Sequence, residues 1–269
     1  MKLTVLMDNN TIIDKYFLGE PAVSYFIEDE GTKILFDVGY SDAYIQNALM
    51  MNIDVHSSNA IVISHGHDDH TRGLKYFFQS GGRESTKMIA HPGAFHKKTI
   101  GDLEIGSPLS SEELGRLCDL HLSREPVKIS ENIWFLGEIL RTNSFEAKHP
   151  IGIVQTADFQ IPDELIDDTA LVYKSKDGIF VITGCSHSGI CNIIEQAKFV
   201  SGETKVLGVI GGFHLFELNE QTLQTIEYLK ENDIRFLYPC HCTSFKVRAE
   251  MSKQMNLIEV GVGMILELE

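Results

Sequence analysis

The chain has 269 residues, of which 43% are apolar and 23% are charged, and its formal net charge is −15. This length fits one large domain or two small ones, and the composition is that of an ordinary globular protein. The negative charge repels a nucleic-acid backbone and an anionic membrane surface, so we expect neither as a partner. A bound metal ion can still make one site locally positive.

Targeting signals and disulfide patterns are not recognisable in the sequence. No apolar run approaches the roughly 18–20 residues that span a bilayer, and the N-terminus lacks the apolar core of a signal peptide. The five cysteines include no CxxC pair, and their odd number argues against a disulfide framework. These features predict a cytoplasmic protein and leave a homo-oligomer open.

The first half of the chain reads as strands that end in polar loops. Strands are predicted for Lys2–Met7, for a hairpin within Val23–Gly39, for Ala60–Ser64 and for Lys87–Pro92. Helices are predicted after Ser41, which is a candidate N-cap, and over the sequence GLKYFF. The segment from about 93 to 125 is broken by glycine and proline and holds one capped helix, SSEELGRLCDL. We interpret it as an insertion or lid within a single domain, 1–269.

The second half alternates strands with helices. Strands are predicted for Asn132–Ile139, Thr169–Lys174, Gly178–Gly184, KVLGVIGG, IRFLYPC and GVGMILEL. Helices are predicted from near Gly189, over NEQTLQTIEYLKEN and over SFKVRAEMSKQM. Early hairpins followed by strand–helix alternation predict mixed sheets that are covered by helices, an α/β (α+β) fold.

Polar ligand-type side chains crowd the loop after Ala60–Ser64, in the sequence ISHGHDDHTRG. Imidazole and carboxylate groups are typical ligands of Zn²⁺ and similar ions, and a catalytic ion usually has about three protein ligands. His65, His67, Asp69 and His70 supply four ligands from one loop and therefore predict two ions. Asp68 is predicted to face away from them.

Histidines also follow several later strands, in ITGCSH, IGGFH and LYPCH. One histidine in such a place means little, but several at strand ends favour a common site, because loops beyond strand ends carry ligands in α/β folds. His91, His96, His121 and His149 are predicted to be structural or surface residues.

The motif HGHDDH matches the HxHxDH signature of the metallo-β-lactamase superfamily, and ILFDVG resembles the strand and Asp-x-Gly turn of that superfamily. The segments SHGHDDHTRGL, ITGCSHSGICN, VIGGFHL and YPCHCT together resemble the branch that includes the archaeal dihydropterin ribofuranosylaminobenzene phosphate synthases. The resemblance runs from about Leu3 to Leu268. It implies a four-layer αββα sandwich with metals at one edge, between the two sheets.

The resemblance assigns metal ligands by position. It implies that His65 and His67 bind the first ion, that Asp69, His70 and His241 bind the second, and that Asp37 supports them. The chain departs from the pattern at Cys185, where many members carry an aspartate that bridges both ions. His187 is our choice for the missing ligand of the first ion. Cys185 is either a thiolate ligand or a small buried residue, and we favour the buried residue.

These assignments predict a dinuclear metal-dependent hydrolase. Zinc is the expected metal, with manganese or iron as alternatives, and a hydroxide bound by both ions is the expected nucleophile. Asp69 is predicted to orient that nucleophile or to accept its proton. His214 is predicted to line the pocket and contact substrate, with simple packing as the alternative.

Helix starts near the site favour an anionic substrate. Backbone N–H groups near Ser188 and Gly189, and near Thr243 and Ser244, are predicted to bind phosphate. We therefore expect a phosphoester or a similar anionic ester-like small molecule as substrate.

Two rival functions remain open from the sequence. The first is a condensing enzyme that uses a phosphorylated pterin-pathway-type substrate, as the synthase name implies. The second is a metal-binding redox protein, although such relatives carry glutamate where this chain has His67, and the chain is too short for their flavin module. A true β-lactamase is disfavoured because no secretion signal is recognisable.

Overall fold

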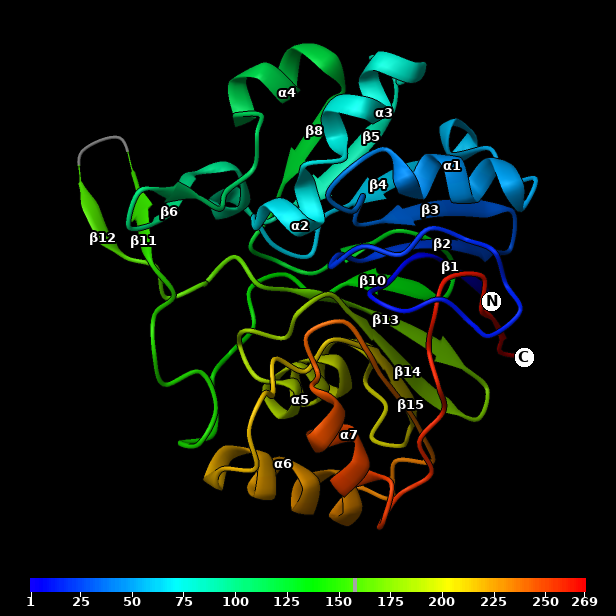
Figure 1. The fold of residues 1–269 in the computed structure, drawn as a ribbon, viewed down its shortest axis with the longest axis vertical. Helices are drawn as coiled ribbons and strands as arrows, with labels where there is room; N and C mark the ends of the chain where they lie inside the picture. The colour runs from blue at the N-terminus through cyan, green and yellow to red at the C-terminus, as the bar shows by residue number, and fades with distance from the viewer. Residues whose placement is uncertain (157–158) are drawn as a thin grey trace.

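The computed structural model describes residues 1–156 and 159–269, which fold into four layers in the order helices, sheet, sheet, helices (Figure 1). This arrangement confirms the predicted αββα sandwich. The two chain termini lie close together at one side of the sandwich. None of the helices in the described residues has both the length and the apolar character needed to cross a membrane.

The first sheet has seven strands, most of which the sequence predicts. Their bounds are β1 Lys2–Met7, β2 Ser24–Asp29, β3 Thr32–Phe36, β4 Ala60–Val62, β5 Lys87–Ala90, β8 Asp119–Leu122 and β17 Ile265–Glu267. They lie in the order β17-β1-β2-β3-β4-β5-β8. Strands β3, β4, β5 and β8 run parallel, so their carboxyl ends meet at one edge.

The second sheet has six strands. Their bounds are β9 Val127–Lys128, β10 Ile133–Phe135, β13 Ala170–Ser175, β14 Gly178–Thr183, β15 Val206–Gly211 and β16 Phe236–Pro239. They lie in the order β16-β15-β14-β13-β10-β9. Strands β14, β15 and β16 run parallel, and the loops that follow them therefore gather at one edge as well.

Helices cover the outer face of each sheet (Figure 1). Their bounds are α1 Ala43–Met50, α2 Asp68–Thr71, α3 Leu74–Ser80, α4 Ser111–Leu117, α5 Ile190–Ser201, α6 Glu220–Glu231 and α7 Phe245–Met251, with short turns η1 Val55–Ser57 and η2 Pro92–Phe95. The predicted capping box of α4 is present at Ser110. The N-cap of α1 is Asp42 rather than Ser41, whose Oγ accepts a hydrogen bond from the Ala43 N–H at 3.1 Å.

The core lies in three apolar layers, one between the sheets and one beneath each set of helices. The layer between the sheets contains Tyr25 and Phe36 from the first sheet and Phe180 from the second, all fully buried. Continuous apolar strands such as β14, which is buried along its whole length, are typical of a sheet that is covered on both faces.

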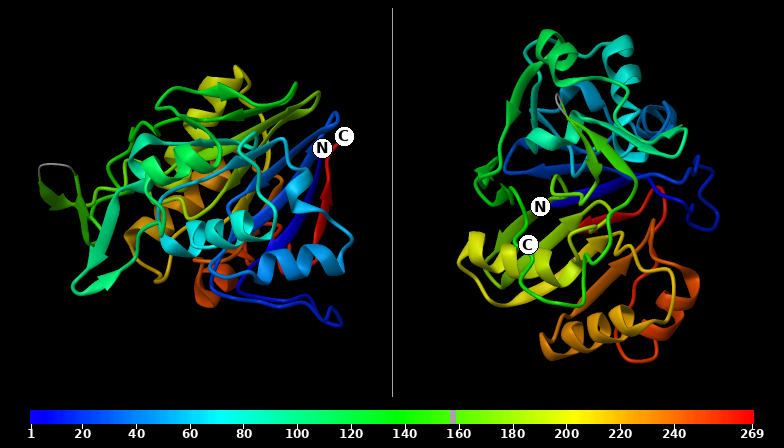
Figure 2. Two further views of the ribbon diagram at one scale, coloured as in Figure 1. Left: turned by 90° about the horizontal axis from the view of Figure 1, so that it is seen from above. Right: turned by 90° about the vertical axis from the view of Figure 1, so that its left-hand side faces the viewer.

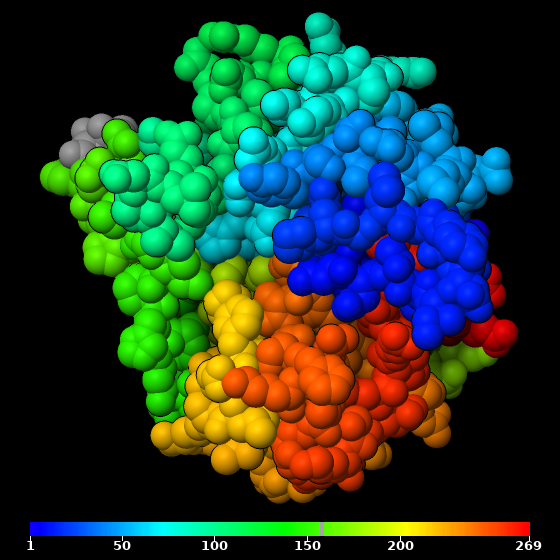
Figure 3. Space-filling view, viewed as in Figure 1, coloured from blue at the N-terminus to red at the C-terminus, as the bar shows by residue number. Residues whose placement is uncertain are grey.

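A small four-stranded sheet projects from the sandwich as an arm (Figures 1 and 2). It consists of β6 Lys97–Ile100, β7 Leu103–Glu104, β11 Ile153–Gln155 and β12 Gln160–Pro162, in the order β12-β11-β6-β7. The space-filling view shows the arm at the edge of the molecule, in contact with the body (Figure 3). The predicted insertion from about 93 to 125 is thus divided, because β6 and β7 lie in the arm whereas β8 completes the first sheet.

A buried ion-pair cluster connects the arm to the loop after β4. The Lys98 ammonium on β6 lies 2.8 Å from a carboxylate oxygen of Asp163 and 2.8 Å from one of Asp167. Asp167 also accepts a hydrogen bond from the Gly66 N–H at 2.8 Å. Buried charges need such partners because removal from water is costly. The arm therefore helps to hold the histidine-rich loop in place.

Candidate metal centre

The parallel strands bring the predicted ligands to one edge of the sandwich. His65 and His67 follow β4, and Asp69 and His70 lie on the short helix α2. Cys185 and His187 follow β14, and His241 follows β16. Residues separated by more than 170 positions in the chain therefore meet in one group.

Three histidines form the first ligand group. The Nε2 atom of His65 lies 3.1 Å from Nδ1 of His67 and 3.2 Å from Nε2 of His187. Zinc–nitrogen bonds of about 2.0–2.1 Å in a tetrahedral site place ligand nitrogens about 3.3–3.4 Å apart. Both observed spacings from Nε2 of His65 are close to that value, and the ligand atoms of His65 group with those of His67 and Asp69 and with those of Cys185 and His187.

The second ligand group contains Asp69, His70, Cys185 and His241. Oδ2 of Asp69 lies 3.2 Å from Nε2 of His241 and 3.5 Å from Nε2 of His70. The Cys185 Sγ atom lies 3.2 Å from Nε2 of each of these histidines. This set offers four donor atoms to a second ion.

Cys185 belongs to both halves of the centre. Its Sγ also groups with the ligand nitrogens of His65 and His187, all within 4.8 Å of one another. The thiol therefore lies where the two sets of potential ligand atoms meet. The sequence favoured a buried packing role for this residue, whereas the geometry surrounds its sulfur with metal-ligating atoms.

Asp37 fixes the orientation of two ligand histidines. Its Oδ2 accepts hydrogen bonds from the Ser64 hydroxyl and from Nδ1 of His70, both at 2.7 Å. Because the Ser64 hydroxyl donates to Asp37, its oxygen accepts from Nδ1 of His65 at 3.0 Å. Both imidazoles therefore carry the proton on Nδ1 and direct the Nε2 lone pair into the centre.

These proton positions test whether a cation fits. Nε2 of His65 carries one lone pair and no proton. The neighbouring nitrogens of His67 and His187 cannot both donate a hydrogen bond to this one lone pair in good geometry. A cation bound to the lone pair of His65 Nε2 would remove this conflict. Nδ1 of His241 pairs with Oδ1 of Asn9 at 3.0 Å, which likewise leaves its Nε2 facing the second group.

The surroundings keep the first-group imidazoles in the neutral form that binds metals. Burial lowers the pKa of His65 and of His187 well below the usual value, and neighbouring histidines lower it further. Burial also lowers the pKa of His67, to about 4. His70 differs, because burial is outweighed by Asp69 and Asp37, which raise its pKa well above the usual value. This carboxylate pair favours positive charge at the second group.

Several known proteins resemble this chain in sequence. A family model described as the metallo-beta-lactamase superfamily matches residues 18–102, which include Asp37 and the HGHDDH loop. An uncharacterized protein of Methanocaldococcus jannaschii is 34% identical over 98% of this chain and 99% of its own length. The 7,8-dihydropterin-6-methyl-4-(beta-D-ribofuranosyl)-aminobenzene-5'-phosphate synthase of the same organism is 31% identical over 91% of this chain and 88% of its own.

The chain belongs to the metallo-β-lactamase superfamily. The resemblance stated from the sequence is therefore confirmed. The fold of this chain also matches the crystal structure of a metal-dependent hydrolase of the beta-lactamase superfamily, with a TM-score of 0.84 and 27% identity. That match covers 100% of this chain and 99% of the other.

The metal centre of this superfamily member opens into a cavity of about 420 Å³. The ligands His67, Asp69, Cys185, His187 and His241 line its floor, and Ile100, Ile105, Ile151 and Phe216 are among its apolar walls. Two of these wall residues come from the arm or lie next to it. Ile100 ends β6, and Ile105 follows β7 directly. The arm therefore shapes the space in which a substrate meets the ligands.

His214 lies in the wall of this cavity, as the sequence predicts, and outside the two main ligand groups. Its ring packs against His187 at 4.3 Å and against Phe216 at 4.8 Å between ring centroids. Its Nδ1 atom is buried without a hydrogen-bond partner among the described residues. His214 also groups with Cys185 and Cys242 as a third set of potential ligand atoms.

The helix start near Ser188 and Gly189 is capped by carboxylates. The N–H groups of Cys191 and Asn192 both donate to Glu146 at 3.0 Å, and the Ser188 N–H donates to Asp168 at 2.8 Å. A phosphate at this place would have to displace two buried acids. The predicted phosphate site there thus has its donors already occupied, and sequence reasoning missed both acids.

Thr243 and Ser244 also have structural partners. The Thr243 Oγ1 atom accepts a hydrogen bond from the Phe213 N–H at 2.9 Å. The Ser244 Oγ atom caps α7 by accepting from the Val247 N–H at 3.4 Å. Neither hydroxyl lines the cavity above the metal ligands. Their predicted role in substrate binding therefore lacks a direct contact with that cavity.

Proposed function

We propose that this chain is a dinuclear metal-dependent hydrolase that acts on a phosphoester or a similar anionic ester-like small molecule. The observation that carries the proposal is the pair of ligand groups that share Cys185 at the floor of one cavity. Zinc is the metal we expect, since nitrogen, sulfur and carboxylate ligands suit it, with manganese and iron as alternatives.

Bound ions at this centre would lower the pKa of a water toward about 7 and polarise the substrate. The residues of the chain then position the reacting groups. Asp69 has a partly exposed side chain at the cavity floor, so its carboxylate can orient a water and accept a proton from it. His214 lines the same cavity, so its imidazole ring can contact substrate.

Three features support an anionic substrate with an organic part. Two divalent ions would bring positive charge to a cavity in a chain whose net charge is otherwise −15. The apolar walls formed by Ile105, Ile151 and Phe216 suit carbon atoms of the substrate. The named synthase relative makes a compound that carries a phosphate, which is consistent with a phosphorylated ligand here.

A condensing enzyme is the second candidate. It is favoured by the 31% identity with a protein named as a synthase, over most of both chains. The metal-dependent hydrolase that matches the fold at 27% identity favours hydrolysis instead. The two functions differ in what they consume, because hydrolysis needs water and no second substrate.

We expect metal-loaded protein to hydrolyse phosphoesters. We also expect inorganic phosphate to inhibit this hydrolysis competitively. The measurement is initial rates on a panel of phosphomonoesters, phosphodiesters, thioesters and lactones, each with and without phosphate. Chelated protein is the control and should be inactive. Hydrolysis of neutral lactones that is unaffected by phosphate at high millimolar concentration would contradict the predicted substrate class. Product formation only with a second substrate would favour the condensing enzyme.

A further inference from the structure

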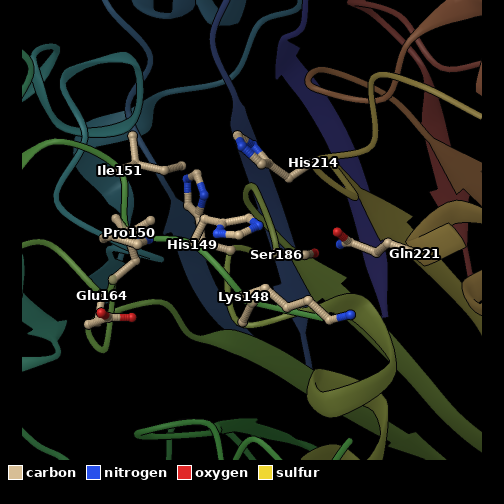
Figure 4. A pocket seen from close by; sticks show the side chains of 11 residues that line it. Lys148, His149, Pro150, Ile151, Glu164, Ser186, His214 and Gln221 are labelled. Carbon is tan, nitrogen blue, oxygen red and sulfur yellow. The ribbon is translucent and has the colours of Figure 1, made fainter. Parts of the chain in front are cut away.

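A second cavity of about 170 Å³ lies beside the metal centre. It shares Ile151, His187 and His214 with the larger cavity above the ligands, so the two spaces are neighbours across these side chains. Figure 4 shows its walls, with Lys148 and His149 from the loop 147–151 and Gln221 from α6. A molecule held at the metal centre can therefore extend toward this second space.

The charges around the second cavity favour an anion. Among the residues that the structure describes, the Lys148 ammonium has no carboxylate within ion-pair distance. The one acid in the wall, Glu164, is paired with Arg141 at 3.7 Å, so its charge is compensated. With 38 acidic residues against 23 Lys and Arg, the chain is acidic overall, and a cavity wall with a lysine that has no acidic partner among the described residues departs from that average.

Neutral groups in the same wall can complete such a site. Gln221 lies in the first turn of α6, and its side-chain amide makes no hydrogen bond within the described part of the chain. Its amide lies on the same side of the pocket as the Lys148 ammonium in the view of Figure 4. Ser186 is less suited, because its hydroxyl already donates to the Gly212 carbonyl at 2.7 Å.

We propose that this second cavity binds a second anionic group of the substrate, remote from the bond that reacts, through Lys148, His149 and Gln221. The group is a phosphate or a carboxylate, since either accepts hydrogen bonds from an ammonium and an amide. The inference rests on the proposed function for one point, which is that the reacting ester binds at the metal centre. Lys148 is then a residue that determines substrate specificity.

The test measures binding rather than turnover. Alkane bisphosphonates of increasing length, and alkylphosphonates of matched length, are titrated by calorimetry into the metal-loaded protein. We expect at least one bisphosphonate to bind roughly tenfold more tightly than its matched monophosphonate, the size of effect that one hydrogen bond to a charged group gives. Matched phosphonocarboxylates show whether a carboxylate serves as well as a phosphonate.

Two variants assign the gain to this cavity. Lys148→Gln should remove the tenfold gain and leave monophosphonate binding unchanged. Lys176→Gln removes the same charge from an exposed turn between β13 and β14, at the end of β14 opposite the metal centre, and should keep the gain. Since Lys148 is exposed, its replacement should not disturb folding.

The outcomes separate this inference from the proposed function. If no bisphosphonate of any length gains affinity, or if the gain survives in Lys148→Gln, the second site is overturned even where esters are hydrolysed. If the gain depends on Lys148 but no ester in the panel is hydrolysed, the second site stands and the proposed hydrolysis fails.

Discussion

His187→Ala is expected to lower the metal content from two ions per chain to one and to abolish measurable turnover. The variant loses Nε2 of His187, which is one of the three nitrogens of the first group. This atom lies 3.2 Å from Nε2 of His65. Replacing residues that merely support a ligand typically costs about 10–100-fold in affinity or activity, so loss of a ligand should cost more than 100-fold. Elemental analysis and initial rates of the purified variant measure both effects.

The control for this variant is His121→Ala, which removes an exposed imidazole from the edge strand β8. It should keep both ions and full activity, and circular dichroism should show that both variants are folded. Full metal retention in His187→Ala would contradict the assignment. His214, whose ring lies 4.3 Å from that of His187, would then be the first alternative ligand to examine.

Cys185→Ser is expected to have the second-largest effect, because the Sγ atom lies 3.2 Å from Nε2 of both His70 and His241. We expect the loss of at least one ion and a fall in turnover of about 10–100-fold, since serine is a far weaker ligand for zinc than a thiolate. Protein substituted with Co²⁺ should show a sulfur-to-metal charge-transfer band that is absent in the variant.

Two further replacements make this result specific. Cys118→Ser changes another buried thiol, in the layer beneath the outer helices, and should keep both ions and the band. Cys185→Asp supplies the carboxylate that many superfamily members carry at this place and should retain two ions without the band. A wild-type protein that lacks the band, with full metal content in Cys185→Ser, would restore the packing role that the sequence favoured.

The sandwich and the ligand-bearing loops were predictable because their signals are local. Apolar runs such as Ala60–Ser64 and Gly178–Gly184 mark buried strands, and polar ligands follow each of them directly. Parallel pairing then brings the strand ends together, so His65 and His187 meet although 122 residues separate them. Pattern and topology together were enough to place the candidate centre.

The arm and the carboxylate that caps α5 were not predictable, for physical reasons. Strands such as β7, with two exposed residues, are too short to show a period of hydrophobicity. The helix start at Gly189 looks free in sequence because its partner, Glu146, comes from a loop 45 residues before Cys191. The position of the Cys185 sulfur depends likewise on contacts with distant loops, which a local motif does not contain.

The metal content of the reconstituted wild-type protein tests the central claim most directly. The purified chain is stripped with a chelator, titrated with Zn²⁺, separated from free metal and measured by elemental analysis against protein concentration. Two ligand groups that share Cys185 predict saturation at two ions per chain. Saturation at one ion per chain would contradict the dinuclear centre and the mechanism built on it.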